Sequence, residues 1–307
     1  MSILVFGHKN PDTDTICSAI AYAELKGKLG KDVKAVRLGE VNEETKFVLD
    51  YFKVEKPELI ESVSGKEIML IDHNERTQTA DGFEEAKVLE LVDHHRISNF
   101  NVDEPLYVRM EPVGCTATII LKLFKENNLL PAPTTAGLML SAIVSDTLLF
   151  KSPTCTGCDV KAGKELAEIA GVNVEEYGLE MLKAGTALGG KSESELINMD
   201  MKIFEVDGSK IGVAQVNTVN EAELLERKEK LLVEINNIIK KEGLKFFIFA
   251  ITNILSNDSI GIVAGDGNAV IEKAFNEKID NNLIALKGVV SRKKQIIPPL
   301  TKAIQEA

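Results

Sequence analysis

The sequence lacks the long hydrophobic run of a membrane-spanning protein. Its longest unbroken apolar stretch, Phe246 to Ile251, has six residues, whereas a membrane-spanning helix needs about 20. The first residues, Met1 to Gly7, contain no basic segment and too short an apolar stretch for a secretory signal. We therefore expect neither a transmembrane nor an exported protein, and no membrane partner.

Cysteine is scarce as well. The four cysteines in 307 residues are too few to suggest a disulfide framework. Cys155 and Cys158 form a C-x-x-C pair, but Cys17 and Cys115 supply no second pair to complete a zinc site. We favour incidental cysteines over a redox motif, and we expect a reduced, cytoplasmic protein.

Basic residues are outnumbered by acidic ones. The 36 lysines and arginines and 47 acidic residues give a formal net charge of −11. The chain as a whole should repel nucleic acid and anionic membranes, so we expect no nucleic-acid partner. A small anionic ligand stays compatible with this charge if basic residues gather locally. The composition, 44% hydrophobic and 27% charged, is typical of a globular protein, and the length suffices for two domains.

Short apolar segments alternate with helical patterns over the first two-thirds of the chain. Strand-like runs lie at residues 3–6, 33–38, 67–71 and 88–92, and helical spacing lies at 16–29, 116–124 and 135–145. Strands that alternate with helices are typical of an α/β fold with a parallel sheet covered on both faces by helices.

A change of pattern indicates a second domain. Small and polar residues gather near 186–194, and we place a linker at 189–195 between an N-terminal domain, 1–188, and a smaller C-terminal domain, 196–307. In the C-terminal part, the pattern predicts a strand, an Asp-Gly turn and a second strand over 201–216. A charged helix at 221–241 and strands at 246–252 and 259–264 follow. This order predicts a second α/β unit with a mixed sheet.

The distribution of histidine is the strongest functional signal. Only four histidines occur, and each follows the end of a predicted strand in the company of carboxylates: His8 with Asp12 and Asp14, His73 with Asp72, and His94 and His95 with Asp93. The carboxyl ends of the strands form one edge of a parallel sheet, where ligands bind. We expect these segments to converge there, joined by Asp146 after the apolar helix.

Divalent cations would explain such a cluster. Several carboxylates gathered without counter-charge repel one another, and four aspartates with two divalent metals are close to neutral. Mixed nitrogen and oxygen donors without thiolate suit Mn²⁺, Mg²⁺, Co²⁺ or Fe²⁺ better than a structural zinc. Helix capping by these polar residues is the alternative for any single motif.

The motifs resemble those of a known superfamily. His8-x-x-x-Asp12-x-Asp14, Asp72-His73-Asn74 and Asp93-His94-His95 resemble the DHH phosphoesterases. More narrowly, residues 7–15, 111–118 and 291–295 resemble segments of the family II, manganese-dependent inorganic pyrophosphatases. The resemblance implies a DHH-type N-terminal domain, a DHHA2-type C-terminal domain, an active site in the cleft between them, and a homodimer.

The same resemblance implies a role for each residue of the cluster. His8 and Asp12 would bind one metal, Asp14, His94 and Asp146 would bind the other, and Asp72 would bridge both. The expected cofactors are two Mn²⁺, with Co²⁺ as a substitute and further Mg²⁺ or Mn²⁺ entering with the substrate. A metal-bridging hydroxide would attack phosphorus, and Asp72, Asp14 and His95 would carry catalytic roles, with His95 also contacting the substrate phosphate.

Basic residues of the expected C-terminal domain complete the implied site. Lys202, Arg292 and Lys293 would bind inorganic pyrophosphate, and the role of Lys294 stays open. The implied reaction is hydrolysis of pyrophosphate to two orthophosphates, with an exopolyphosphatase or another DHH phosphoesterase as the alternative. No histidine follows His95, which argues against the nucleotide-directed relatives. A non-catalytic metal-binding module is disfavoured because all six implied ligands are present.

Overall fold

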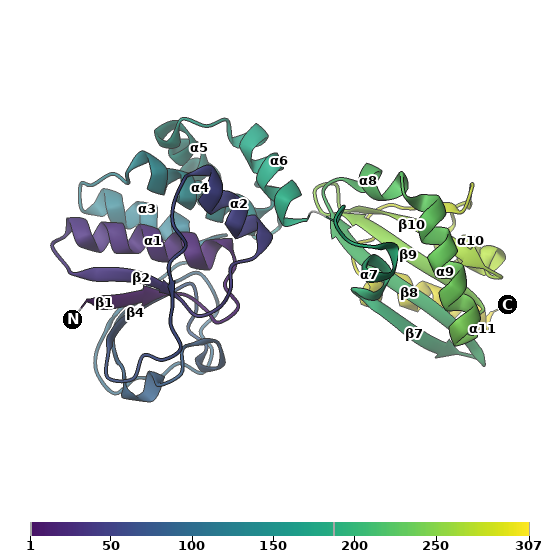
Figure 1. Cartoon of the computed structure of the whole chain (residues 1–307), viewed down its shortest axis with the longest axis horizontal. Coiled ribbons are helices and arrows are strands. Elements are labelled where there is room, and N and C mark those ends of the chain that lie inside the picture. Colours follow the sequence, from purple (N-terminus) through teal and green to yellow (C-terminus); the bar gives the residue numbers. More distant parts are fainter. Residues whose placement is uncertain (1, 187, 307) are drawn as a thin grey trace. The chain divides into compact units, whose positions relative to one another are not determined.

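The chain folds into two units, Met1–Gly185 and Thr186–Ala307 (Figure 1). The computed structural model describes residues 2–186 and 188–306. The two-domain α/β organisation that the sequence predicts is confirmed. The expected linker at 189–195 belongs by its contacts to the second unit, and its last three residues open a short helix that begins at Glu193.

The first unit is built on a parallel sheet. Its strands are β1 (Ile3–Phe6), β2 (Val33–Arg37), β3 (Glu58–Leu59), β4 (Glu67–Ile71), β5 (Lys87–Asp93) and β6 (Tyr107–Met110). They lie in the order β3-β2-β1-β4-β5-β6, and every neighbouring pair is parallel. The chain moves outward from β1 in one direction to β2 and in the other to β4, so a topological switch point lies between β1 and β4. Ligands of open α/β sheets bind at such a point.

Helices gather on one face of this sheet. They are α1 (Thr13–Lys28), α2 (Glu43–Tyr51), α3 (Thr116–Glu126), α4 (Pro133–Thr147), α5 (Gly157–Ala170) and α6 (Val174–Gly185) (Figure 1). The predicted strands and helices of this unit are confirmed within a few residues at their ends. The helices α2, α5 and α6 were not predicted, because their apolar stripes are short and interrupted by charged residues.

The opposite face differs from the expected cover of helices. Here Phe6, Ile68 and Leu70 pack with Val63 and Phe83 in one buried cluster. The connections that supply this cover contain only two 3₁₀ turns, η1 (Arg76–Gln78) and η2 (Phe83–Glu85). Loops rather than α-helices therefore close this side of the core.

The second unit contains a mixed sheet, as predicted. Its strands are β7 (Met201–Val206), β8 (Ser209–Thr218), β9 (Phe246–Asn253), β10 (Asp258–Gly265) and β11 (Leu283–Leu286), in the order β11-β10-β9-β8-β7. Only β8 and β9 pair in parallel. The predicted turn between β7 and β8 is confirmed: Asp207 and Gly208 have φ of 46° and 73°, which the two-residue hairpin turn with positive φ at both central positions requires.

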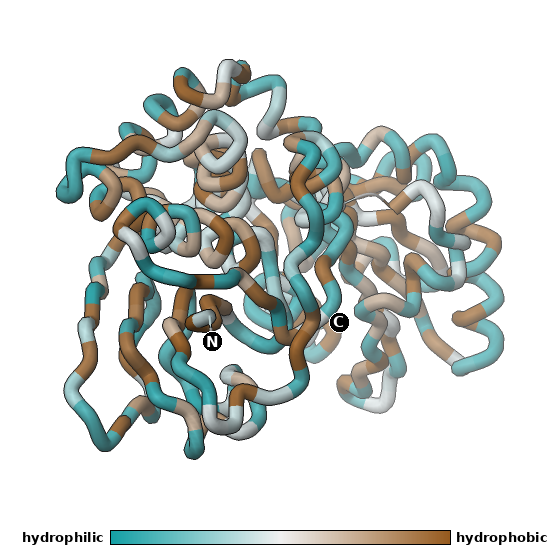
Figure 2. The backbone as a smooth tube through the Cα atoms, turned by 60° about the vertical axis from the view of Figure 1, so that its left-hand side comes forward, coloured by the Kyte–Doolittle hydropathy of each residue, from teal (hydrophilic) through white to brown (hydrophobic). Residues whose placement is uncertain are grey.

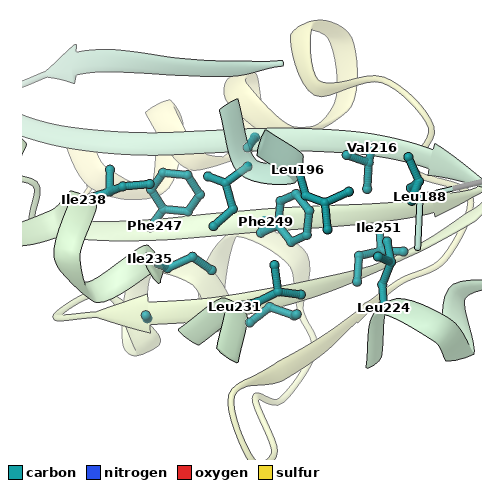
Figure 3. Close-up of a cluster of buried hydrophobic side chains, with 14 of the residues drawn as sticks. Leu188, Leu196, Val216, Leu224, Leu231, Ile235, Ile238, Phe247, Phe249 and Ile251 are labelled. Atoms are coloured by element: carbon teal, nitrogen blue, oxygen red, sulfur yellow. The ribbon is translucent and has the colours of Figure 1, made fainter. Parts of the chain in front are cut away.

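Helices cover both faces of this second sheet. Residues from α7 (Glu193–Asn198), α8 (Glu221–Leu225) and α9 (Lys228–Glu242) form one buried cluster with β9, in which Leu196 and Leu231 contact Phe249 and its neighbours (Figure 3). Helices α10 (Asn268–Phe275) and α11 (Ile297–Gln305) pack in the other. The helix predicted at 221–241 is divided, because the chain leaves regular helix geometry at Arg227, where ψ is 7°.

Hydropathy follows this layering. Figure 2 shows hydrophobic and hydrophilic segments alternating along the outer helices, as expected for elements with one buried side. Among the residues that the structure describes, no helix combines the length and the apolar character needed to cross a lipid bilayer.

Candidate metal centre

The predicted ligands of the first unit converge at the switch point of its sheet. His8 lies two residues after the end of β1, Asp72 directly follows β4, and His94 directly follows β5. Asp12 is the N-cap of α1, Asp14 lies in its first turn, and Asp146 lies in the last turn of α4. Three strand ends and two helices thus deliver side chains to the same place, as the sequence pattern predicts.

One group of donors contains His8, Asp12 and Asp72. Each offers a ligand atom, and these atoms lie within 4.8 Å of one another. The Nε2 atom of His8 is 3.4 Å from Oδ2 of Asp12 and 3.6 Å from Oδ2 of Asp72. This spacing suits a shared cation better than direct hydrogen bonds.

A second group surrounds the other oxygen of Asp72. The Nε2 atom of His94 is 3.4 Å from Oδ1 of Asp72 and 3.8 Å from Oδ2 of Asp146. Ligand atoms of Asp14, Asp146 and Cys115 also lie within 4.8 Å of one another. The two oxygens of Asp72 therefore face different histidines, which is the arrangement that a bridging carboxylate needs.

Cys115 is a neighbour that the sequence analysis did not place in the site. Its side chain is fully buried, and burial together with the charge of Asp14 raises the pKa of its thiol well above the ordinary value. A thiol is also a soft donor, which suits hard divalent cations less well than carboxylate oxygens do. Cys115 therefore fills space beside the carboxylates, and the oxygen and nitrogen donors remain the ones suited to hard divalent cations.

The pKa values of the cluster reflect burial and the electrostatic repulsion between its carboxylates. Burial and the charge of Asp14 raise the pKa of Asp72 to about 7, and the same causes raise the pKa of Asp146 well above the ordinary range. Burial alone would lower the pKa of His94, but its close contact with Asp72 and the charges of Asp14 and Asp72 raise it to about 9. The residues present thus fit a pair of divalent cations, which would offset these negative charges.

Backbone strain lies beside two of the predicted ligands. Asp72 has φ of 60°, in the left-handed region, while its N–H donates to the carbonyl of Val92 at 2.9 Å. Leu148, Leu149 and Phe150, which follow the helix that carries Asp146, also have positive φ. Such conformations cost about 1–2 kcal/mol each for residues other than glycine, and strain of this kind is common at functional sites.

His95 is held by a carboxylate outside the predicted ligand set. Its Nδ1 donates to Oδ1 of Asp93 at 2.9 Å, and Nδ2 of Asn74 donates to Oδ2 of the same carboxylate at 2.6 Å. Asp93 is fully buried, and although burial opposes ionisation, the hydrogen bonds from His95 and Asn74 lower its pKa. Asp93 and Asn74 therefore orient the His95 ring, a function that sequence reasoning missed although both residues stand in the motifs.

A cavity of about 300 Å³ adjoins the donor cluster. Its lining includes His8, Asn10, His95 and Arg96. His73 also borders it, but this ring is buried, its Nδ1 donates to the carbonyl of Ile71 at 2.9 Å, and burial lowers its pKa to about 4. His73 belongs to none of the donor groups of the cluster among the described residues, which agrees with its omission from the predicted ligands.

The predicted basic residues all belong to the second unit. Arg292 lies at the start of the π-helix η3 (Arg292–Ile296) and is buried, with Nη1 2.9 Å from Oδ1 of Asp200. Its backbone N–H donates to Oε1 of Gln215 at 2.9 Å. Lys202, on β7, and Lys293 are exposed. The pairing of Arg292 with Asp200 had no signal in the sequence.

Comparisons with known proteins match both units. The description "DHH family, N-terminal domain" fits residues 2–143, and "DHHA2 domain" fits residues 179–303. A protein of Exiguobacterium sp. named "Probable manganese-dependent inorganic pyrophosphatase" is 59% identical over 304 residues, which cover 98% of each chain. A Bacillus cereus protein of the same name is 55% identical over 305 residues, or 99% of each chain.

Solved structures agree with these sequence matches. The crystal structure of a Methanococcus jannaschii protein assigned as a family II inorganic pyrophosphatase is 43% identical, covers 99% of this chain and 100% of its own, and has a TM-score of 0.63. An exopolyphosphatase-related protein from Bacteroides fragilis covers 99% of this chain and 92% of its own with a TM-score of 0.51, but at 14% identity it shows the fold alone.

Proposed function

The chain belongs to the family of manganese-dependent inorganic pyrophosphatases, and we propose that it hydrolyses inorganic pyrophosphate to two orthophosphates at the donor cluster of its first unit. The observation that carries this proposal is the placement of Asp72. Its two oxygens lie 3.6 Å and 3.4 Å from the Nε2 atoms of His8 and His94, respectively. This spacing supports a role for Asp72 as a carboxylate that bridges two cation positions.

We assign the ligands of the two positions from these contacts. His8, Asp12 and Asp72 would hold one Mn²⁺, and Asp14, His94 and Asp146 would hold the other together with Asp72. When bound, such a metal pair supplies Lewis-acid stabilisation of the phosphoryl group and lowers the pKa of water. Co²⁺ has similar ligand preferences and would substitute, and further Mg²⁺ or Mn²⁺ would enter with the substrate.

His95 and the basic residues bind the phosphate groups. Asp93 holds the Nδ1 side of the His95 ring, so Nε2 is left to donate to a phosphate oxygen. The hydrogen bond from His95 to Asp93 raises the pKa of the ring despite partial burial, which favours its protonated, donating form. Arg292 grips a phosphate through parallel N–H donors, and Lys202 and Lys293 add compact positive charges.

Substrate comparison tests this function. Protein freed of metal and reloaded with Mn²⁺ should release orthophosphate from pyrophosphate with a kcat/KM at least about tenfold above that for tripolyphosphate, and should not cleave a short dinucleotide. Arg292→Ala should raise KM for pyrophosphate and leave Mn²⁺ binding unchanged, while Glu205→Gln, an exposed change on the same unit, is the control. Preference for tripolyphosphate would favour an exopolyphosphatase and contradict the proposal.

We also propose a homodimer that uses the edge strand β6. This strand ends the sheet order, and its Tyr107 and Val108 are 43% and 47% exposed. An exposed, apolar edge strand is a template for pairing with another chain. Sedimentation should give a dimer mass for the wild type and a monomer mass for Val108→Lys. A monomeric wild type would overturn this assignment and leave the catalytic proposal intact.

Two further expectations accompany the enzyme. All four cysteines are free thiols, which suits the reducing conditions of the cytoplasm, and cell fractionation would test this location. The net charge of −11 opposes nucleic-acid binding. A gel-shift assay at low salt should therefore show no complex with single- or double-stranded DNA.

A further inference from the structure

Two threonines donate to the carboxylate of Asp72, one to each oxygen. Oγ1 of Thr15 donates to Oδ2 at 2.8 Å, and Oγ1 of Thr116 donates to Oδ1 at 3.1 Å. All three side chains are buried, with exposed fractions of 2% or less. The two hydroxyl groups are therefore shielded from water, and their bonds fix the rotation of the carboxylate.

The two threonines also bind the other carboxylates of the cluster. The backbone N–H of Thr15 donates to Oδ1 of Asp12 at 2.9 Å, and the backbone N–H of Thr116 donates to Oδ2 of Asp14 at 2.8 Å. Thr15 thus holds Asp72 and Asp12, whose oxygens face His8. Thr116 holds Asp72 and Asp14 on the side of Asp72 that faces His94.

We propose that Thr15 and Thr116 are positioning residues, each of which sets one oxygen of Asp72 and one further carboxylate for one of the two cation positions. The inference rests on the proposed dinuclear site. A carboxylate oxygen has two lone-pair directions. A hydroxyl group that occupies one of them leaves the other free for a cation, so the two threonines divide the bridging carboxylate between the two positions.

Two motif glycines make room for this arrangement. A Cβ at Gly7 would lie 2.5 Å from Cγ2 and 2.9 Å from Oγ1 of Thr15. A Cβ at Gly114 would lie 2.9 Å from Oδ2 of Asp159, which accepts the N–H of Gly114 at the same distance. Gly7 therefore lets the backbone pass close to the side chain of Thr15, and Gly114 lets the segment that carries Thr116 approach Asp159.

The segment that carries Thr116 is anchored on both sides. The carbonyl of Val113 accepts from Nδ1 of His94 at 3.1 Å, which leaves Nε2 of that ring to face Asp72. Asp159, fully buried on α5, accepts from the Gly114 N–H and from Oγ1 of Thr118 at 2.6 Å. The position of Thr116 is therefore set by the fold rather than by a flexible loop.

Isosteric variants test the proposal by metal binding, independently of activity. Thr15→Val and Thr116→Val remove one hydroxyl each, and calorimetric titration of the metal-free variants with Mn²⁺ should show one binding step weakened by about 10–100-fold, the usual effect of losing a group that orients a ligand. The other step should change by less than about threefold. Thr15→Ser and Thr116→Ser keep the hydroxyl and should restore wild-type binding.

Double variants identify which position each threonine serves. In an Asp146→Asn background, which disables the position beside His94, Thr15→Val should still weaken the remaining step, whereas Thr116→Val should not. Thr45→Val is the matched control, since Thr45 is a fully buried threonine of the same unit whose hydroxyl contacts that of Thr13 at 3.1 Å. Its Mn²⁺ binding should equal that of the wild type.

The outcomes separate this inference from the proposed function. A wild type that binds two Mn²⁺ and cleaves pyrophosphate, together with unchanged Mn²⁺ binding in both valine variants, would overturn the positioning roles alone. A wild type that binds fewer than two Mn²⁺ would overturn the dinuclear site itself. Should a valine variant fail to fold, Thr15→Ala or Thr116→Ala removes the hydroxyl without placing a methyl against the carboxylate, and the same loss of affinity is expected.

Discussion

Asp159 offers a sharp test of how the candidate site is supported. Its buried carboxylate accepts from the N–H of Gly114 at 2.9 Å, from Oγ1 of Thr118 at 2.6 Å, and from the N–H and hydroxyl of Thr156 at 2.7 and 2.6 Å. It thereby ties the first turn of α5 to the segment that carries Thr116. We predict that Asp159→Ala destabilises the first unit and weakens Mn²⁺ binding.

The structure sets the size of this effect. An unsatisfied buried N–H at Gly114 costs about 1–3 kcal/mol, and the lost capping interaction at Thr156 costs about 1 kcal/mol. The hydroxyl of Thr118 can turn toward a carbonyl of its own helix, so its loss adds at most about 1 kcal/mol. The free energy of unfolding should fall by about 2–5 kcal/mol, which lowers Tm by about 4–20 °C for a unit of this size.

The chain provides its own probe for this measurement. It has no tryptophan, and its four tyrosines, at positions 22, 51, 107 and 177, all lie in the first unit. Tyrosine fluorescence during thermal unfolding of metal-free protein therefore reports on that unit. Glu168→Ala, an exposed change on the same helix, should stay within about 0.5 kcal/mol of the wild type.

The pH dependence of the same comparison supplies a second check. Burial would raise the pKa of Asp159, but the hydrogen bonds from Thr118, Thr156 and Gly114 lower it. A lowered folded-state pKa means that the contribution is complete above the unfolded value of about 3.9 and is lost as the pH falls through the folded value. The difference between wild type and Asp159→Ala should therefore shrink in acid. A Tm at pH 7 within about 2 °C of the wild type, where a fall of about 4–20 °C is expected, would refute the anchoring role.

Three further predictions concern the metals and the substrate. Asp72→Asn should lower kcat/KM by more than about 100-fold and release Mn²⁺, because the effect of losing a ligand should exceed the 10–100-fold effect of losing a group that orients a ligand. Near-normal turnover with full metal content would show that Asp72 does not bridge two metals. Asp200→Asn should lower KM for pyrophosphate by up to about fivefold, because the half-exposed Asp200 carboxylate competes with phosphate for Arg292 and such an ion pair is worth about 0–1 kcal/mol. A raised KM would mean that Asp200 orients the guanidinium productively. Mn²⁺ affinity measured by calorimetry should rise between pH 6 and 9, because His94 must lose its proton to bind a metal and has a pKa of about 9 in the metal-free protein. A pH-independent affinity would exclude His94 as a ligand.

The position of the candidate site could be predicted from the sequence because it follows a rule about sheets. Histidines and aspartates stand immediately after apolar runs, and the carboxyl ends of parallel strands meet at one edge. The structure brings His8, Asp72 and His94 together in this way. Their roles as ligands stay predictions until metal binding is measured.

The supporting contacts could not be predicted, because they join residues far apart in the chain. The bond from the Thr116 N–H to Asp14 spans 102 positions, and the bond from Thr15 to Asp72 spans 57. No periodicity or spacing encodes such a pair. The pairing of Arg292 with Asp200, 92 positions apart, escaped prediction for the same reason.

The cover of the first sheet shows a different limit. Alternation of strands and helices predicted helices on both faces, but the segments 72–86 and 94–106 that follow β4 and β5 contain no α-helix. Phe83 from one of these loops still packs into the buried cluster on that face. A strand pattern predicts that a face is buried, and the length and composition of each connection decide what buries it.

The central claim is that the donor cluster holds two Mn²⁺ and that both are needed to cleave pyrophosphate. Stepwise addition of Mn²⁺ to metal-free protein, with orthophosphate release measured after each addition, tests it most directly. We predict that activity reaches its plateau at two equivalents per chain and that Asp72→Asn shows no such plateau. A plateau at one equivalent, or hydrolysis without added metal, would contradict it.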